Sequence, residues 1–389
     1  MKALRWLLLP LLLACTAQPA LAQDAPAESA ANTYTPPKVI GNPVTSPRRP
    51  SIASGSSKEL AYPENAQRRG MEGLVFARFD LDASGKPTNV RIDPDGFHVD
   101  IFGPAVKRWV SQSVRFNPAM ENGEPVALQG LRLPVRFSMN MKPGITREFR
   151  EEIDKVVKLL DARDFPGAHH HAQWMLTEKA KLNYEYAVLQ ATLANTLART
   201  GKMHAALDAA RAATDPVRPK LNDLNPLSDE KLDLSEQDFL LPGEMTDQLL
   251  RLRFILAASQ GLDFEAAQSY AYLRALGKID AADVITSEAE KILVRLKSAP
   301  SLTGTVQVDE SGHWTHLALL PYLAVRDVEG GAITQLIVHC SGPDIGYNDP
   351  AQIPAIIKMG ASESGYCQVA IFASPGTRMH LIEYRQPPP

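Results

Sequence analysis

Three kinds of hydrophobic pattern follow one another along this chain of 389 residues. Between residues 57 and 142 apolar and polar positions mostly alternate, with one helical stretch inserted. From 145 to 298 the period is helical, and from 301 to 389 alternation returns. Alternation is typical of half-buried strands, whereas a period of about 3.6 is typical of amphipathic helices. The order therefore predicts an α+β domain, a helical domain and a small β-rich domain, which the length can accommodate.

The first domain is predicted to be a three-stranded antiparallel sheet covered by two helices. A short helix is expected at 64–69, entered through Pro63, and a second one from residue 100, where one apolar stripe begins. In the strand at 75–81 one face is expected to be buried. In the final strand the core-facing positions are Leu131, Leu133, Val135, Phe137 and Met139.

Pro134 makes this final strand a predicted sheet edge, because proline cannot donate to a strand ladder and is tolerated where its nitrogen faces outward. A long edge strand is a template on which another extended chain can pair. Two occupants stay open here: a peptide from another protein, or a neighbouring domain or second copy of this chain, as in a homodimer. Proline in place of Leu133 is expected to abolish docking without unfolding the domain. Within the strand at 126–139, the predicted partner-binding residues are Leu131, Arg132, Leu133, Pro134, Val135, Arg136 and Phe137.

Short motifs occur in a fixed order through this domain. They are Tyr62-Pro63-Glu64-Asn65-Ala66, Gly70-Met71-Glu72-Gly73, Val114-Arg115-Phe116-Asn117-Pro118-Ala119, Gly123, Pro125-Val126 and Pro134-Val135-Arg136-Phe137. Over residues 58–140 their order and spacing resembles the C-terminal domain of the TonB energy-transducer family. The resemblance implies a non-enzymatic module without a cofactor, which binds a short peptide of an outer-membrane receptor by strand addition.

The chain departs from the family pattern in two respects. Val114 stands where the family often has tryptophan. Transducers also carry this domain last, behind a retained membrane helix with a histidine and a long spacer, whereas here the domain comes first. The sequence therefore predicts an envelope protein-binding protein, linked to outer-membrane transport, with a membrane-anchored energy transducer as the alternative.

Residues 1–22 have the features of a secretory signal peptide: two basic residues, an apolar stretch and a small-residue cleavage site. A linker rich in proline, alanine and serine follows at 23–56. We therefore expect export to the periplasm. A retained leader that anchors the chain in the inner membrane, or lipid attachment at Cys15, would instead bring membrane contact. A net charge of −3 argues against nucleic-acid binding, which needs a basic surface.

The helical domain, 145–298, contains a half-motif that occurs three times, at 162–168, 198–206 and 260–267. Ala168 and Ala206 are 38 residues apart, close to the tetratricopeptide period of about 34. A degenerate tetratricopeptide-like array is therefore predicted, which would offer a second binding surface. An unrelated helical bundle is the alternative.

The β-rich domain, 301–389, is predicted to contain strands near 305–308, 334–339, 368–372 and 379–382. Cys340 and Cys367 remain after leader removal, and in an oxidising compartment two cysteines predict a disulfide. The histidines at 169–171, and His313 with His316, suggest metal ligands, but neither spacing lets the side chains converge on one ion from a regular helix or strand. No metal, cofactor or enzymatic activity is predicted, and a metal-binding or enzymatic final domain is the second alternative.

Overall fold

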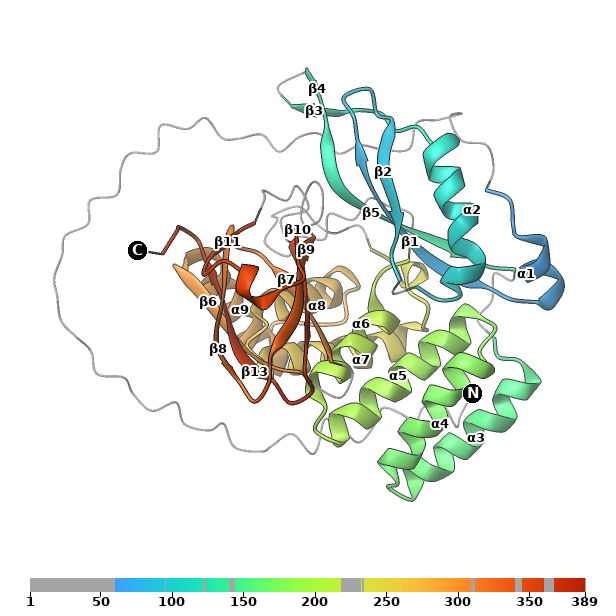
Figure 1. Ribbon diagram of the computed structural model, residues 1–389. Coiled ribbons are helices and arrows are strands. Elements are labelled where there is room, and N and C mark those ends of the chain that lie inside the picture. The colour runs from blue at the N-terminus through green and yellow to red at the C-terminus, as the bar shows by residue number, and fades with distance from the viewer. Residues whose placement is uncertain are drawn as a thin grey trace.

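The computed structural model describes residues 60–94, 96–121, 124–139, 144–217, 232, 234–308, 312–339, 345–359 and 367–388. Three parts are visible in Figure 1: an α+β part at the upper right, a helical array below it, and a β-rich part beside the array. The predicted α+β fold class is confirmed. The expected signal peptide, the linker and Cys15 lie outside the described residues.

The N-terminal part is an antiparallel sheet in the order β2-β1-β5. Its first helix begins after Pro63 and ends at Gly70, whose φ of 65° is favourable for glycine. Gly73 lies so close to Phe102 of α2 that an added Cβ would be 2.2 Å from the ring. The two helices and the three sheet strands confirm the predicted layout, and the separate β3–β4 hairpin was not predicted. The bounds are α1 Glu64–Arg69, β1 Gly73–Leu81, β2 Pro87–Ile92, α2 Val99–Gln112, β3 Ala119–Glu121, β4 Glu124–Val126 and β5 Leu128–Phe137.

Both faces of β1 are buried, which corrects the expectation of one buried face on this strand. One face packs on α2, through Val75, Ala77 and Phe79. On the other face, Leu74 and Phe76 join the core of the helical part. Phe97 extends that contact, since its ring stacks on Tyr186 at 4.7 Å between centroids. The N-terminal part is thus packed against the helices.

The helical part is an array in which each helix packs on the next one. The three predicted half-motifs lie at the turns between paired helices, α3–α4, α5–α6 and α7–α8. Each turn has one residue with positive φ, Arg163 (60°), Gly201 (79°) or Gly261 (72°). In all three turns this residue's N–H donates three positions back and the next N–H donates five positions back, which is the Schellman pattern. The bounds are α3 Arg147–Asp161, α4 Phe165–Glu178, α5 Asn183–Arg199, α6 Met203–Thr214, η2 Glu236–Asp238, α7 Gly243–Ser259, α8 Asp263–Ala275 and α9 Val284–Ser298.

The turns therefore repeat in conformation as well as in sequence. Ala168, Ala206 and Ala266, one beside each turn, are completely buried, because a small side chain lets paired helices approach closely. The assignment to the tetratricopeptide class itself stays a prediction.

The C-terminal part has two four-stranded antiparallel sheets, ordered β10-β9-β12-β7 and β11-β8-β13-β6. This confirms a β-rich end, whereas β7 and β8 had not been predicted as strands. Cys367 is buried and disulfide-bonded. Cys340 lies outside the described residues, so its pairing with Cys367 stays a prediction. The bounds are β6 Ser301–Gln307, β7 His313–Ala318, β8 Tyr322–Glu329, β9 Ile333–His339, β10 Ile345–Tyr347, η3 Pro350–Gln352, β11 Ile357–Lys358, β12 Cys367–Ala373 and β13 Arg378–Tyr384.

None of the helices in the described residues combines the length and the apolar composition needed to cross a bilayer.

Candidate functional site

Strand β5, which contains the predicted partner-binding residues, lies at one edge of its sheet. It pairs with β1, and among the described strands no other pairs with it. The pairing is in register from Gly73 opposite Phe137 to Phe79 opposite Leu131. Among the described strands, β5 therefore lies at the edge of its sheet, as the sequence predicted.

The outward-facing backbone groups of β5 follow from the hydrogen bonds of β1. Leu74 exchanges two backbone bonds with Phe97, of 3.1 and 2.7 Å, and the carbonyl of Phe76 accepts from Asp93 at 2.9 Å. Both residues thus turn their polar groups away from β5. Because these groups alternate in direction along a strand, Gly73, Val75 and Ala77 face β5 instead.

Residues of β5 opposite the outward-turned positions of β1 face the outer edge of the sheet, where no described strand pairs. They are Arg136 opposite Leu74, Pro134 opposite Phe76, and Arg132 opposite Arg78. Arg132 and Arg136 each offer an N–H and a C=O to a further strand, whereas Pro134 offers a C=O alone. This places the nitrogen of Pro134 outward, as the sequence predicted.

The apolar residues of the predicted partner-binding site face the core of the domain instead. Leu133, Val135 and Phe137 are buried against α2, and Leu131 is half-buried beside them. By the same alternation, the N–H of Leu133 faces Ala77 of β1. Proline at position 133 would remove a hydrogen bond of the internal ladder, so this substitution tests the fold of the domain as well as docking, and its expected outcome stays a prediction. Met139 was also predicted to face the core, but it lies beyond the end of β5 and is 38% exposed.

The far end of β5 is fastened to the helical part by Glu72, which sequence reasoning missed. Its side chain is 6% exposed. One carboxylate oxygen accepts from the Ser138 hydroxyl (3.1 Å) and the Met139 N–H (3.0 Å). The other accepts from the N–H of Asn183 at the start of α5 (3.0 Å). The amide of Asn183 also donates to the Phe137 carbonyl (2.8 Å), so this end is held by α5.

Two rings lie next to Glu72. The hydroxyl of Tyr62 donates to the Met71 carbonyl at 2.6 Å. Burial, with a smaller contribution from the Glu72 carboxylate, raises the pKa of Tyr62 to about 12. His98 Nδ1 lies 2.8 Å from the Glu72 carbonyl oxygen, and burial lowers the pKa of this imidazole. Both rings favour the neutral form beside a buried carboxylate.

Arg78 links the sheet to the C-terminal part. Its guanidinium binds Asp93 at 2.9 Å and donates to the side chain of Gln368 on β12. The N-terminal part is thus bonded to both other parts of the chain. In the sequence, Glu72 and Arg78 are charged residues in otherwise apolar stretches. This pattern could have identified them as residues that make polar contacts.

Three of the histidines considered as metal ligands have other partners. His171 Nε2 lies 3.0 Å from Glu152, and His316 Nε2 lies 2.7 Å from Glu383. The ring of His313 packs on Phe372. Among the described residues no group of three or more potential ligand side chains could hold a metal ion.

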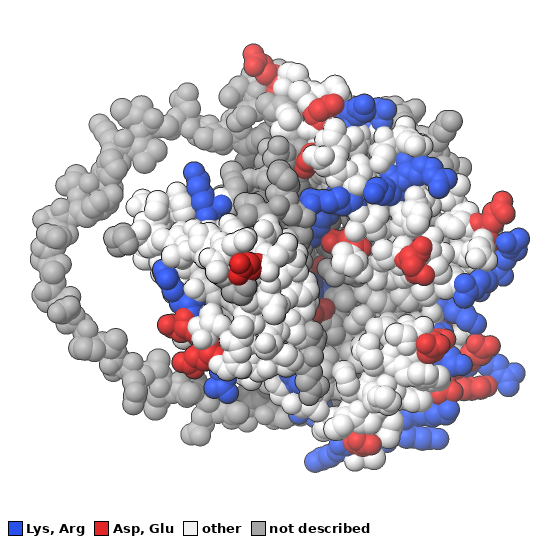
Figure 2. Space-filling view, viewed as in Figure 1, with Lys and Arg blue, Asp and Glu red and all other residues white. Residues whose placement is uncertain are grey.

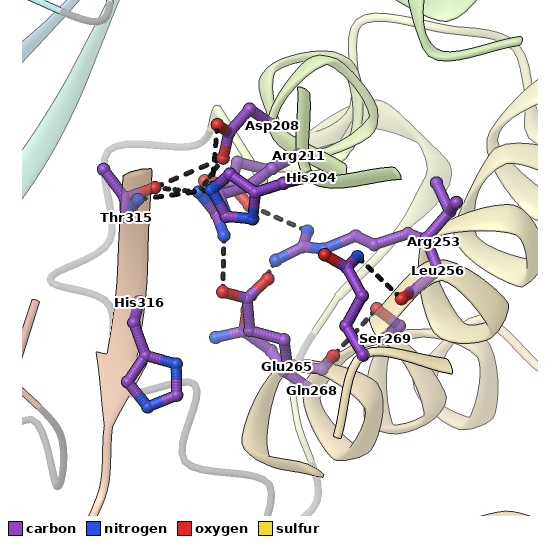
Figure 3. Close-up of polar contacts among 12 residues, drawn as sticks. His204, Asp208, Arg211, Arg253, Leu256, Glu265, Gln268, Ser269, Thr315 and His316 are labelled. Carbon is purple, nitrogen blue, oxygen red and sulfur yellow. Dashed lines mark hydrogen bonds and ion pairs between the residues drawn. The ribbon is translucent and has the colours of Figure 1, made fainter. Parts of the chain in front are cut away.

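A second polar cluster joins α6, α7 and α8 to β7 (Figure 3). Arg211 binds Asp208 at 2.8 Å and also pairs with the fully buried Glu265. Burial alone would lower the pKa of Arg211, but Glu265 and Asp208 raise it overall. Arg253, also fully buried, binds Asp215 at 2.9 Å. Within this cluster the buried charges are paired, as the low dielectric requires.

The comparisons with known proteins concern the N-terminal part. Residues 58–139 match the family described as Gram-negative bacterial TonB protein C-terminal. Two proteins named Protein TonB, from two strains of Xanthomonas campestris pv. campestris, are 32% identical over 92 residues. The match covers 23% of this chain, and the chain spans 39% of each relative's length. Residues 58–139 are thus a TonB C-terminal domain, as their motifs had indicated.

Proposed function

We propose that this chain is an envelope protein that binds an extended segment of another protein, which pairs with the outer edge of β5. The observation that carries the proposal is the row of outward backbone groups from Arg132 to Arg136, with which no described strand pairs. The TonB C-terminal domain supports a protein partner, and an outer-membrane receptor is the partner class that the family implies.

A comparison within the chain supports the proposal. β7 is also an edge strand, but the N–H of its Thr315 donates to a helical side chain, His204. Proteins commonly cover sheet edges in this way, because an open edge invites pairing with other chains. The edge of β7 is capped by a helical side chain, whereas no described strand pairs with the outer edge of β5, and this difference favours a binding role for β5.

The surface charge suggests what surrounds the bound segment. A short band of basic side chains crosses the upper part of Figure 2. On β5 itself, Arg136 is an exposed cation. Opposite charges across strands stabilise pairing, so we expect a partner with acidic residues and binding that weakens with added salt.

The experiment places a photoreactive amino acid at the exposed position 136 and compares two substitutions at Arg132 in the exported protein. Arg132→Pro removes an outward N–H, whereas Arg132→Ala keeps it and removes the same charge. We expect crosslinking to the partner to be lost in the first variant and to persist in the second. Equal crosslinking in both variants would reject strand addition, and a crosslink between two copies of this chain would identify self-pairing instead. Amide exchange of β1 verifies that both variants are folded.

A membrane-anchored energy transducer is the second candidate, because the two relatives carry the TonB name. Fractionation separates the candidates: a transducer stays with the inner membrane, whereas a processed periplasmic protein is released with the periplasm.

A further inference from the structure

The contact between α6 and β7 has a hydrogen bond whose acceptor can change charge. The backbone N–H of Thr315 donates to Nε2 of His204 over 3.3 Å. A nitrogen that accepts a hydrogen bond carries a lone pair and no proton, so His204 is neutral in this arrangement. Both groups are buried.

The same nitrogen has a second neighbour. Asp208 Oδ2 lies 3.4 Å from His204 Nε2, one helical turn along α6. Nε2 can donate to this carboxylate only when it is protonated, and it then cannot accept from Thr315. The two interactions therefore exclude each other, and the presence or absence of a proton on Nε2 determines which of them forms.

Charged residues on the helices packed around His204 influence which of the two hydrogen bonds forms. On α6, Asp208 favours a charged imidazole, while Arg211 binds Asp208 and the Thr315 hydroxyl at 2.8 and 3.0 Å. Glu265 on α8 pairs with Arg211, and Arg253 on α7 pairs with Asp215. The two neighbouring cations, Arg211 and Arg253, are thus each paired with carboxylates, and His204 is the histidine of this cluster.

Trp314 lies next to the same contact, so its fluorescence can be used to follow the state of that contact. The centroid of its ring lies 5.0 Å from that of His204 and 5.4 Å from that of His316. On β13, Glu383 binds His316 Nε2 at 2.7 Å and also accepts from the backbone N–H groups of Leu319 and Leu320. His316 is thus a matched control, because it stacks on the same indole but makes no bond to the helices.

We propose that the hydrogen bond between His204 and Thr315 is a pH-sensitive contact between the helical array and the C-terminal sheets. We call this contact the latch. Above the histidine range the neutral ring holds the N–H of Thr315 on β7. In mild acid the charged ring turns its proton to Asp208, and the buried N–H of Thr315 loses its acceptor. This edge of β7 then loosens while the strand pairing inside the sheet is kept.

The test is hydrogen exchange of the Thr315 amide in the full chain, expressed as a protection factor so that the pH dependence of exchange chemistry itself is removed. Between about pH 7.5 and pH 5.5 we expect protection to fall about tenfold in the wild type. Trp314 fluorescence should change over the same range, and Trp314→Phe identifies that signal. His204→Gln, which keeps an acceptor that does not titrate, should remove the pH dependence, whereas His316→Gln should retain it for Thr315.

Constant protection of Thr315 in the wild type over this range would overturn the latch. So would an unchanged pH dependence in His204→Gln. If His204→Gln does not fold, Asp208→Asn replaces it: loss of the competing carboxylate should move the transition to lower pH, and a transition that stays in place would contradict the mechanism.

Discussion

One carboxylate contributes several hydrogen bonds to the attachment of the TonB C-terminal domain to the helices, and Glu72→Ala should weaken this attachment. In the native chain the carboxylate accepts three hydrogen bonds, from Ser138, Met139 and Asn183. Removal leaves the N–H groups of Met139 and Asn183 without this acceptor. The hydroxyl of Ser138, on an exposed residue, can bond to water instead.

The magnitude follows from the two backbone donors. A buried donor that loses its acceptor costs about 1–3 kcal/mol. Asn183 is 1% exposed, so water cannot easily replace the carboxylate there. We therefore expect the local opening free energy at Asn183 to fall by about 2 kcal/mol, which corresponds to roughly thirtyfold faster exchange of its amide.

Hydrogen exchange is the appropriate assay because it reports local opening without assuming that a chain with several parts unfolds in two states. Glu64→Ala, an exposed acid a few residues away on α1, is the control and should leave Asn183 protected. The reasoning is refuted if the Asn183 amide exchanges at the wild-type rate in Glu72→Ala.

Three further predictions concern separate sites. Arg163 has a φ of 60° where the matching turns have glycine, so Arg163→Gly should stabilise the protein by about 1 kcal/mol, measured as a higher denaturation midpoint; a lower midpoint would contradict the strain. Because the folded-state pKa of Tyr62, about 12, exceeds its ordinary value of 10.0, folding favours the neutral phenol. The stability from Tyr62 is thus complete below pH 10.0 and is lost as the pH rises towards 12, and ultraviolet titration of wild type against Tyr62→Phe should find one phenol ionising late. Finally, Gln368 pairs with His339, the residue before Cys340, so non-reducing peptide mapping should recover Cys340 joined to Cys367; a free thiol at Cys340 would reject the pairing.

Much of the fold could be predicted from local pattern. The structure confirms the helix at 64–69 and the alternation of Leu133, Val135 and Phe137 towards the core. Among the described strands, the one that contains Pro134 also lies at the edge of its sheet. These features depend on neighbours along the chain: proline lacks a donor wherever it stands, and alternate residues face alternate sides of any strand.

The other features of the fold are determined by packing between residues that are far apart in the sequence. Alternation gives the face of β1 on which Phe76 lies, but the helices that bury this face come from a distant part of the sequence. Thr315 and His204 are 111 residues apart, so no local period connects them. A motif could therefore identify the TonB C-terminal domain, while the attachment by Glu72 and the proton-dependent contact of His204 exist only once the three parts are packed together. The physical reason is that the partner of a buried polar group is set by which surfaces meet, and the chain pattern specifies each surface without specifying its neighbour.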